Sequence, residues 1–147
     1  MIKRILVATD ASKAANRAVD LAADMATKYG SSIEILYVVR HMQLPPELRK
    51  MAQVENVAQR EADVMRFVAQ KVLGDAEARA KKKGAKDVRT SMNLGDPATQ
   101  IIKYAERRHA DLIVMGTRGL GKVKEMFLGS VSRKVCNLSP VSCLTVR

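Results

Sequence analysis

The sequence contains no tryptophan, and its other aromatic residues, three tyrosines and two phenylalanines, are scattered over 147 positions. Proteins that bind single-stranded nucleic acids commonly stack the bases on clustered, exposed aromatic side chains. Because no such cluster occurs here, we do not expect nucleic acid to be the partner.

Long apolar runs are also missing. A membrane-spanning helix needs roughly 20 consecutive apolar residues, and no stretch of this chain approaches that length. The apolar run near the N-terminus, residues 5–8, is too short for a signal peptide and meets Asp10 before any cleavage site. We therefore expect a cytoplasmic protein that does not contact a membrane.

Cysteine and histidine are scarce, with two of each: Cys136, Cys143, His41 and His109. They are too few, and too widely spaced, to predict a zinc site. Apolar surroundings and a reducing cytosol favour buried free thiols over a disulfide or a nucleophile. We predict no metal site.

Acidic residues are outnumbered, with 15 against 26 basic residues, which gives a formal net charge of +11. Such a surplus favours anionic partners such as nucleotides, nucleic acids or acidic proteins. Basic residues are densest at 79–83 and at 118–124. The first cluster suits a helix C-terminus, where the macrodipole stabilises cations; a patch that contacts nucleic acid is the alternative.

Apolar runs typical of strands alternate with helical patterns along the chain. Strands are expected at residues 2–8, 33–39, 88–93, 111–115 and 141–146. The first helix follows Ser12, with Ala14, Ala18, Leu21, Ala22 and Met25 on its inner face, and Gly30 stops it. A long helical register covers 47–83, and Asp96 and Pro97 begin the third helix as its cap and first residue.

The chain has the length of one domain, and no linker or repeat divides it, so we expect residues 1–147 to form a single domain. Strands joined through helices cannot form hairpins, which predicts a mainly parallel sheet with helices on both faces. Ligands of such α/β folds bind beyond the carboxyl ends of the strands. Four strand exits therefore matter: Thr9-Asp10, Val38-Val39, Gly95-Asp96 and Met115-Gly116.

The strongest motif follows the fourth expected strand. Gly116, Gly119, Gly129 and Ser130 give the spacing G-x2-G-x9-G-S. Residues 116–122 match the start of a P-loop, but Val123 stands where a P-loop needs a hydroxyl for Mg²⁺. We expect the glycines to permit positive φ and close approach of backbone amides to phosphates, with the helix that begins at Ser130 adding its positive end.

This loop, directly after a buried strand, resembles the nucleotide-binding loop of ATP-binding members of the universal stress protein family. The resemblance covers the whole chain and includes four further segments: Val7-Ala8-Thr9-Asp10, Leu36-Tyr37-Val38, Gly95-Asp96-Pro97 and Pro140-Val141. It implies a five-stranded sheet of order 3-2-1-4-5, with the nucleotide across the exits of strands one and four.

The resemblance also implies which residues bind ATP, with or without Mg²⁺. Asp10 and Val38 would lie at the adenine and ribose end, with Thr9 beside them. The ribose and phosphates would be followed by Met115, Gly116, Arg118 and Gly119, and the phosphates would be held by Gly129, Ser130, Val131 and Ser132. The last strand, Val141 to Val146, would pair with its two-fold mate in a homodimer.

Three functions fit these residues. The first is an ATP-binding regulatory protein of the stress response, acting as a nucleotide-dependent dimeric switch. The second is a slow ATPase or phosphotransferase, although Asp10 has no obvious second carboxylate beside it, so no catalytic residue is assigned. The third is a ligand-free protein that contacts acidic partners or nucleic acid. The glycine-rich loop favours the first.

Overall fold

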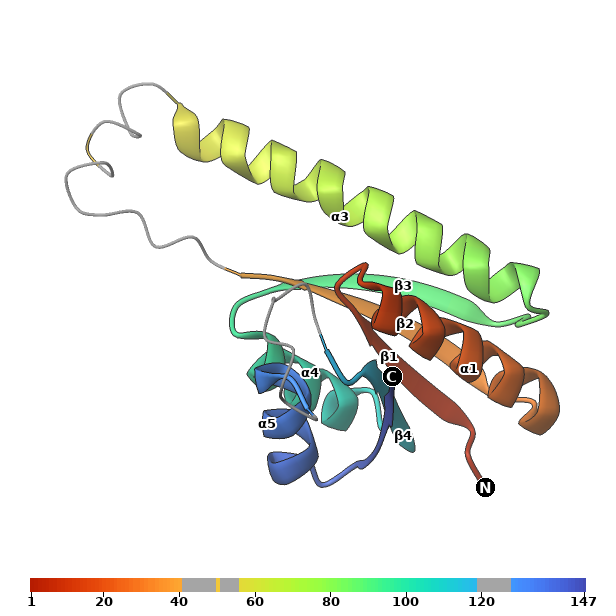
Figure 1. The fold of residues 1–147 in the computed structure, drawn as a ribbon. Helices are drawn as coiled ribbons and strands as arrows, with labels where there is room; N and C mark the ends of the chain where they lie inside the picture. Colours follow the sequence, from red (N-terminus) through yellow and green to blue (C-terminus); the bar gives the residue numbers. More distant parts are fainter. Residues whose placement is uncertain (41–49, 51–55, 119–127) are drawn as a thin grey trace.

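A computed structural model describes residues 1–40, 50, 56–118 and 128–147 of the chain. These residues form a five-stranded parallel sheet in the order β3-β2-β1-β4-β5 (Figure 1). Its strands are β1 (Arg4–Thr9), β2 (Ser32–Val39), β3 (Val88–Leu94), β4 (Leu112–Gly116) and β5 (Ser142–Val146). The predicted fold class and strand order are confirmed.

Helices cover both faces of the sheet, as predicted (Figure 1). One face is covered by α1 (Lys13–Tyr29) and α3 (Val57–Lys82), and the other by α4 (Pro97–Arg107) and α5 (Ser130–Leu138). Because every strand is parallel to its neighbours, each connection has to return along one face of the sheet from the end of one strand to the start of the next. The helices lie in these crossover connections.

The core consists of two apolar layers that share the central strands. Along β1, Ile5 and Val7 face α1 and α3, whereas Leu6 faces α4 and α5, and all three are at most 1% exposed. Parallel strands that are buried on both faces have nearly continuous apolar runs. Burial of each of these side chains stabilises the folded state by roughly 1.5–3 kcal/mol. This burial holds β1 in place, and the carboxyl end of β1 leads into α1.

The start of α1 is capped by Ser12, whose Oγ accepts a hydrogen bond of 3.1 Å from the amide of Ala15. The inner face of α1 consists of small residues, Ala14, Ala15, Ala18, Ala22, Ala23 and Ala26, together with Val19. Leu21 was predicted to lie on this face but is 36% exposed. The alanine stripe lets the helix lie close to the sheet and turns Leu21 outward.

The prediction of one helical register over residues 47–83 is wrong at Asn56. This residue stands immediately before α3 and has φ 53, in the left-handed region. Residues 47–49 and 51–55 lie outside the described part of the chain. Only the second half of α3 packs on the sheet, through Ala69, Leu73, Ala76 and Ala80. The first half extends beyond the sheet (Figure 1), which leaves Phe67 72% exposed.

The start of α4 is the one predicted: Asp96 caps the helix and Pro97 is its first residue. Cys136 and Cys143 are free thiols, but they are half-buried rather than buried. Burial raises the pKa of Cys143 to about 11, which keeps this thiol protonated. Over the described ranges, no helix has the length and apolar character needed to cross a membrane.

Candidate functional site

A cavity of about 640 Å³ lies at the carboxyl ends of β1, β2 and β4. Ten of the eleven predicted site residues line it: Thr9, Asp10, Val38, Met115, Gly116, Arg118, Gly129, Ser130, Val131 and Ser132. The eleventh, Gly119, lies outside the described residues. The strand order reverses between β1 and β4, which is the point where ligands of open α/β sheets bind.

The carbonyl of Thr117 links the end of β4 to the start of α5 by hydrogen bonds. This oxygen accepts a hydrogen bond of 2.6 Å from the amide of Gly129 and one of 3.0 Å from the hydroxyl of Ser132. The amide of Thr117 in turn donates to the carbonyl of Val146 in β5, at 2.7 Å. Residues 117 and 129 are therefore held against each other at the edge of the cavity.

Three backbone amides at the start of α5, those of Ser130, Val131 and Ser132, have no acceptor among the described residues. The first helical hydrogen bond runs from the amide of Arg133 to the carbonyl of Gly129, at 3.0 Å. Gly129 is the N-cap and has no side chain to satisfy the amides. Open amides at a helix N-terminus, with the positive end of the macrodipole, bind anions.

At Gly116 and Gly129, glycine is required for space and not for positive φ, so the predicted positive φ is wrong at these two positions. Gly129 has φ −67, and Gly116 lies outside the positive-φ region too. A Cβ at Gly116 would come within 2.8 Å of the Cβ of Ala14, and one at Gly129 would lie 3.2 Å from the carbonyl oxygen of Thr117. Both glycines let backbone segments pack closely.

Ser130 and Ser132 differ in what their side chains do. The hydroxyl of Ser132 is buried and lies between two carbonyl oxygens, those of Thr117 and Gly129, at 3.0 and 3.1 Å. Because the hydroxyl is engaged in these two contacts, only the backbone amide of Ser132 is available to a ligand in the cavity. The side chain of Ser130 is exposed.

Among the described residues that line the cavity, Asp10 is the single acidic one. One of its carboxylate oxygens accepts a hydrogen bond of 2.9 Å from the amide of Ser12, so Asp10 shapes the turn that leads into α1. Thr9 has a similar role, since its Oγ1 accepts from the amide of Ala11 at 3.2 Å. Asp10 does not cap α1, because Ser12 is the N-cap.

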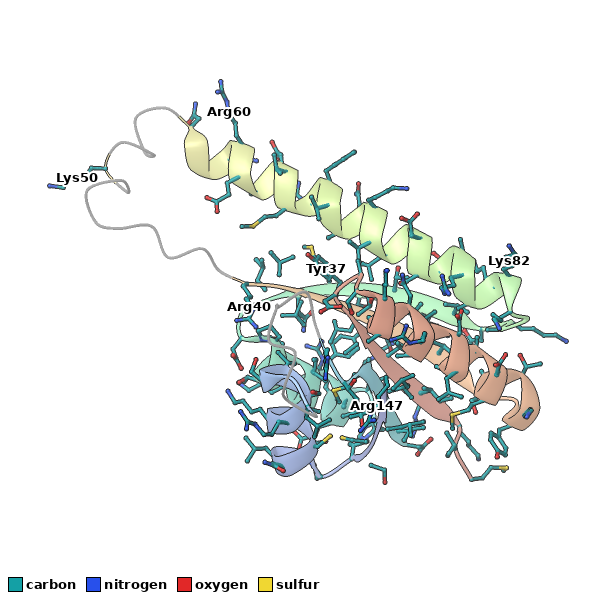
Figure 2. The ribbon with its side chains drawn as sticks, viewed as in Figure 1. Tyr37, Arg40, Lys50, Arg60, Lys82 and Arg147 are labelled. Carbon is teal, nitrogen blue, oxygen red and sulfur yellow. The ribbon has the colours of Figure 1, made fainter. Side chains whose placement is uncertain are left out.

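The remaining lining residues are mostly apolar. From β2 and the residue after it come Leu36, Tyr37, Val39 and Arg40, from α4 Pro97 and Ile101, and from β1 and α1 Ala8 and Ala15. Figure 2 labels Tyr37 and Arg40 near the carboxyl end of β2. At the exit of β2, only Val38 was predicted to line the site. Ile101 was not predicted, because helical spacing identifies an inner face without showing that this face also borders a cavity.

The N-terminus of α4, which carries Pro97 into the cavity wall, is tied to α5. Asp96 accepts hydrogen bonds from the amide and the hydroxyl of Thr99, at 3.0 and 2.6 Å, and from Lys134 of α5 at 3.1 Å. These contacts lower the pKa of Asp96 to about 2, the hydrogen bond from the Thr99 side chain contributing most. The two helices bordering the cavity thus share a charged link.

A parallel sheet with helices on both faces defines an open-sheet α/β protein, and its cavity with open helix amides lies at the reversal point, where such folds bind their ligands. The sequence profile of the Universal stress protein family matches residues 1–147. The chain is 33% identical to universal stress protein YxiE of Bacillus subtilis over 151 aligned positions, with all of both chains covered. The chain therefore belongs to the universal stress protein family.

Solved structures agree with this assignment. The structure of the hypothetical protein MJ0577 matches with a TM-score of 0.83 at 27% identity, covering 99% of this chain and 96% of that one. A universal stress protein crystallised in complex with cAMP matches with a TM-score of 0.74 at 26% identity, covering 99% and 97% of the two chains. The fold and the family are thus established by independent similarities.

Proposed function

We propose that this protein binds ATP in the cavity at the ends of β1, β2 and β4 and acts as a regulatory protein rather than through turnover. The observation that carries the proposal is the presence, in one cavity, of three open amides at the start of α5 and an apolar wall from β2 and α4. A similar universal stress protein binds cAMP, an adenine nucleotide.

The two ends of the cavity suit the two ends of ATP. The phosphates would accept hydrogen bonds from the amides of Ser130, Val131 and Ser132, where the macrodipole of α5 adds positive potential. The adenine would lie on the apolar wall formed by Val38, Val39 and Ile101. A volume of about 640 Å³ falls in the range of small-molecule sites.

Proline at position 130 provides a direct test of the amides. Ser130 is the first residue of α5, where proline is tolerated, and Gly129 before it has φ −67 and ψ 167, which proline's preceding residue favours. Ser130→Pro therefore deletes one amide and leaves the helix intact, whereas Ser130→Ala deletes only the hydroxyl. A lost hydrogen bond to a charged group is worth about 1.5–3 kcal/mol, or roughly 10- to 150-fold in Kd.

The two variants should separate in calorimetric titrations with ATP. Ser130→Pro should bind at least about tenfold more weakly than Ser130→Ala, with both variants melting cooperatively. For the wild type, ATP at ~100 times Kd adds about 2.7 kcal/mol to stability, which raises Tm by several degrees. Equal affinity of the two variants would place the phosphates elsewhere, and the absence of any ATP-dependent shift in wild type would contradict ATP binding.

A slow ATPase or phosphotransferase is the second candidate, and Asp10 is the observation that favours it, as a carboxylate in the cavity wall. Phosphoryl transfer requires a group that orients the nucleophile and stabilised charge on the leaving group. For a regulatory protein, phosphate release from ATP and Mg²⁺ should be far slower than ~1 per second. Sustained release in the range of ordinary enzymes, lost in Asp10→Asn, would replace the regulatory proposal.

A further inference from the structure

A second cavity, of about 350 Å³, lies at the opposite ends of the strands, near the amino ends of β1 and β2 and the C-terminus of α4. Four arginines line it: Arg4, Arg89, Arg107 and Arg108. They come from β1, β3 and the end of α4, so that no single helical repeat or charged run of sequence produces the cluster.

The guanidinium groups are oriented by contacts that do not use their outer nitrogens. The Nε of Arg4 donates to the carbonyl of His109 at 2.6 Å, and the Nε of Arg108 donates to Glu34 at 2.9 Å. Arg107 lies over the ring of Tyr104, 5.0 Å from its centroid. In the described residues, no hydrogen bond from a terminal Nη atom of these three arginines is found.

Negative charge near the cluster is already engaged. Tyr104 and Arg108 both donate hydrogen bonds to Glu34; burial alone would raise its pKa, but these contacts lower it, so Glu34 is a carboxylate at neutral pH. Asp111 accepts from the amides of Lys3 and Arg4, at 2.9 and 2.8 Å. The lining contains four arginines against the one carboxylate of Glu34, a net charge of +3.

We propose that this cavity binds a small anion with two or more phosphoryl groups, of the pyrophosphate or triphosphate type. Arginine and lysine each occur thirteen times in the chain, yet every cation of these two kinds in the cavity is arginine. Arginine forks bind phosphoryl oxygens in pairs, which lysine cannot do. Among the described residues, no tyrosine, phenylalanine or tryptophan lines the cavity, and His109 is the one ring there on which a base could stack.

The macrodipole of α4 does not account for the cluster. Its negative end stabilises cations in the last turn, which includes Arg107. Arg4 and Arg89 belong to β1 and β3, and their convergence on the same cavity brings positive charges together at an electrostatic cost. A bound polyanion removes that cost, and the predicted affinity should therefore fall as salt is raised.

The test uses the full chain without ATP, because ATP itself carries a triphosphate, and inorganic triphosphate as the probe. In NMR titrations the backbone signals of residues 33–34, 89 and 107–110 should move, and the Kd is taken from these signals, so that any binding in the first cavity is measured separately. Arg89→Gln and Arg107→Gln should each weaken binding about tenfold or more. Arg89 is exposed and its contact to Asp87 is 3.6 Å long, so its loss should leave the fold intact.

Arg60→Gln is the matched control, because it removes the same charge from the outer part of α3, away from the cavity (Figure 2). Binding by this variant should equal that of wild type. The proposal is overturned if Arg60→Gln weakens binding as much as Arg89→Gln, or if the signals of residues 33–34, 89 and 107–110 do not move. It is also overturned if duplex DNA binds these arginines more tightly than triphosphate at physiological salt.

Discussion

Gly116 ends β4 at the point where the backbone touches the first turn of α1. A Cβ there would lie 2.8 Å from the Cβ of Ala14 and 2.9 Å from the backbone nitrogen of Ala15. Gly116→Ala should therefore destabilise the protein by about 1–3 kcal/mol, because one element has to move away. In thermal unfolding, each kcal/mol lowers Tm by roughly 2–4 °C at this chain length.

Gly74 is the matched control for this substitution. It lies inside α3, and a Cβ there would meet no atom within 4 Å. Gly74→Ala should raise stability by about 0.4–1 kcal/mol, because alanine restricts the unfolded chain and favours helix. A lower Tm for Gly74→Ala, or an unchanged one for Gly116→Ala, would contradict the packing described here.

At the scale of the elements, Asp96 connects α4 to α5. Its folded pKa of about 2 is below its ordinary value of 3.8, so its contribution to stability is present above pH 4 and is lost as the pH falls through 2. Asp96→Ala should lower the free energy of unfolding by about 1 kcal/mol at pH 6, mainly through the lost cap. Measured by urea unfolding, this difference should shrink toward pH 2.

Asp63→Ala gives the comparison, because Asp63 forms an exposed pair with Arg66 at 3.8 Å within α3 and caps nothing. Its effect should stay within about 0.5 kcal/mol. If the cost of Asp96→Ala were the same at pH 2 as at pH 6, the ionised form of Asp96 would not be what holds the two helices.

The elements show which parts of the structure local sequence patterns can predict. The start of α4 was predicted correctly because Asp96 and Pro97 form a local signal that needs no tertiary contact. The start of α3 was not, because a helical apolar pattern continues through Asn56, whose left-handed φ of 53 breaks the helix. The pattern also could not show that Phe67 lies beyond the sheet and remains exposed.

The candidate site was predictable to the extent that it follows from topology and motif. Strand exits in a parallel sheet converge, which brought together Asp10, Val38 and Gly116. What the sequence could not provide was the role of each group. Ser132 was expected to hold phosphates, yet its hydroxyl is used by the Thr117 carbonyl, a partner fifteen residues away in sequence.

At the scale of the whole molecule, β5 forms one edge of the sheet. We propose that this edge pairs with a second copy in a homodimer, since exposed edges recruit other strands. The carbonyl of Val146 accepts from Thr117 beside β4, so by alternation the amide of Thr145 points outward. Thr145→Pro should then block pairing without removing a bond to β4, and light scattering should give a monomer where wild type gives a dimer.

Leu144→Pro is the comparison, because the amide of Leu144 points toward β4 and its loss should also lower Tm. A monomeric mass of wild type at micromolar concentration, or a dimer of Thr145→Pro, would show that the β5 edge is not where two copies pair.

Thr117 has a consequence for how the cavity can respond to events at the edge of the sheet. Its carbonyl holds Gly129 and Ser132 at the start of α5, and its amide donates to the carbonyl of Val146 in β5. One residue therefore joins the open amides of α5 to the last residue of the edge strand. A strand that binds at this edge and shifts Val146 would shift the start of α5 with it, so that assembly and ligand affinity would be coupled through two hydrogen bonds.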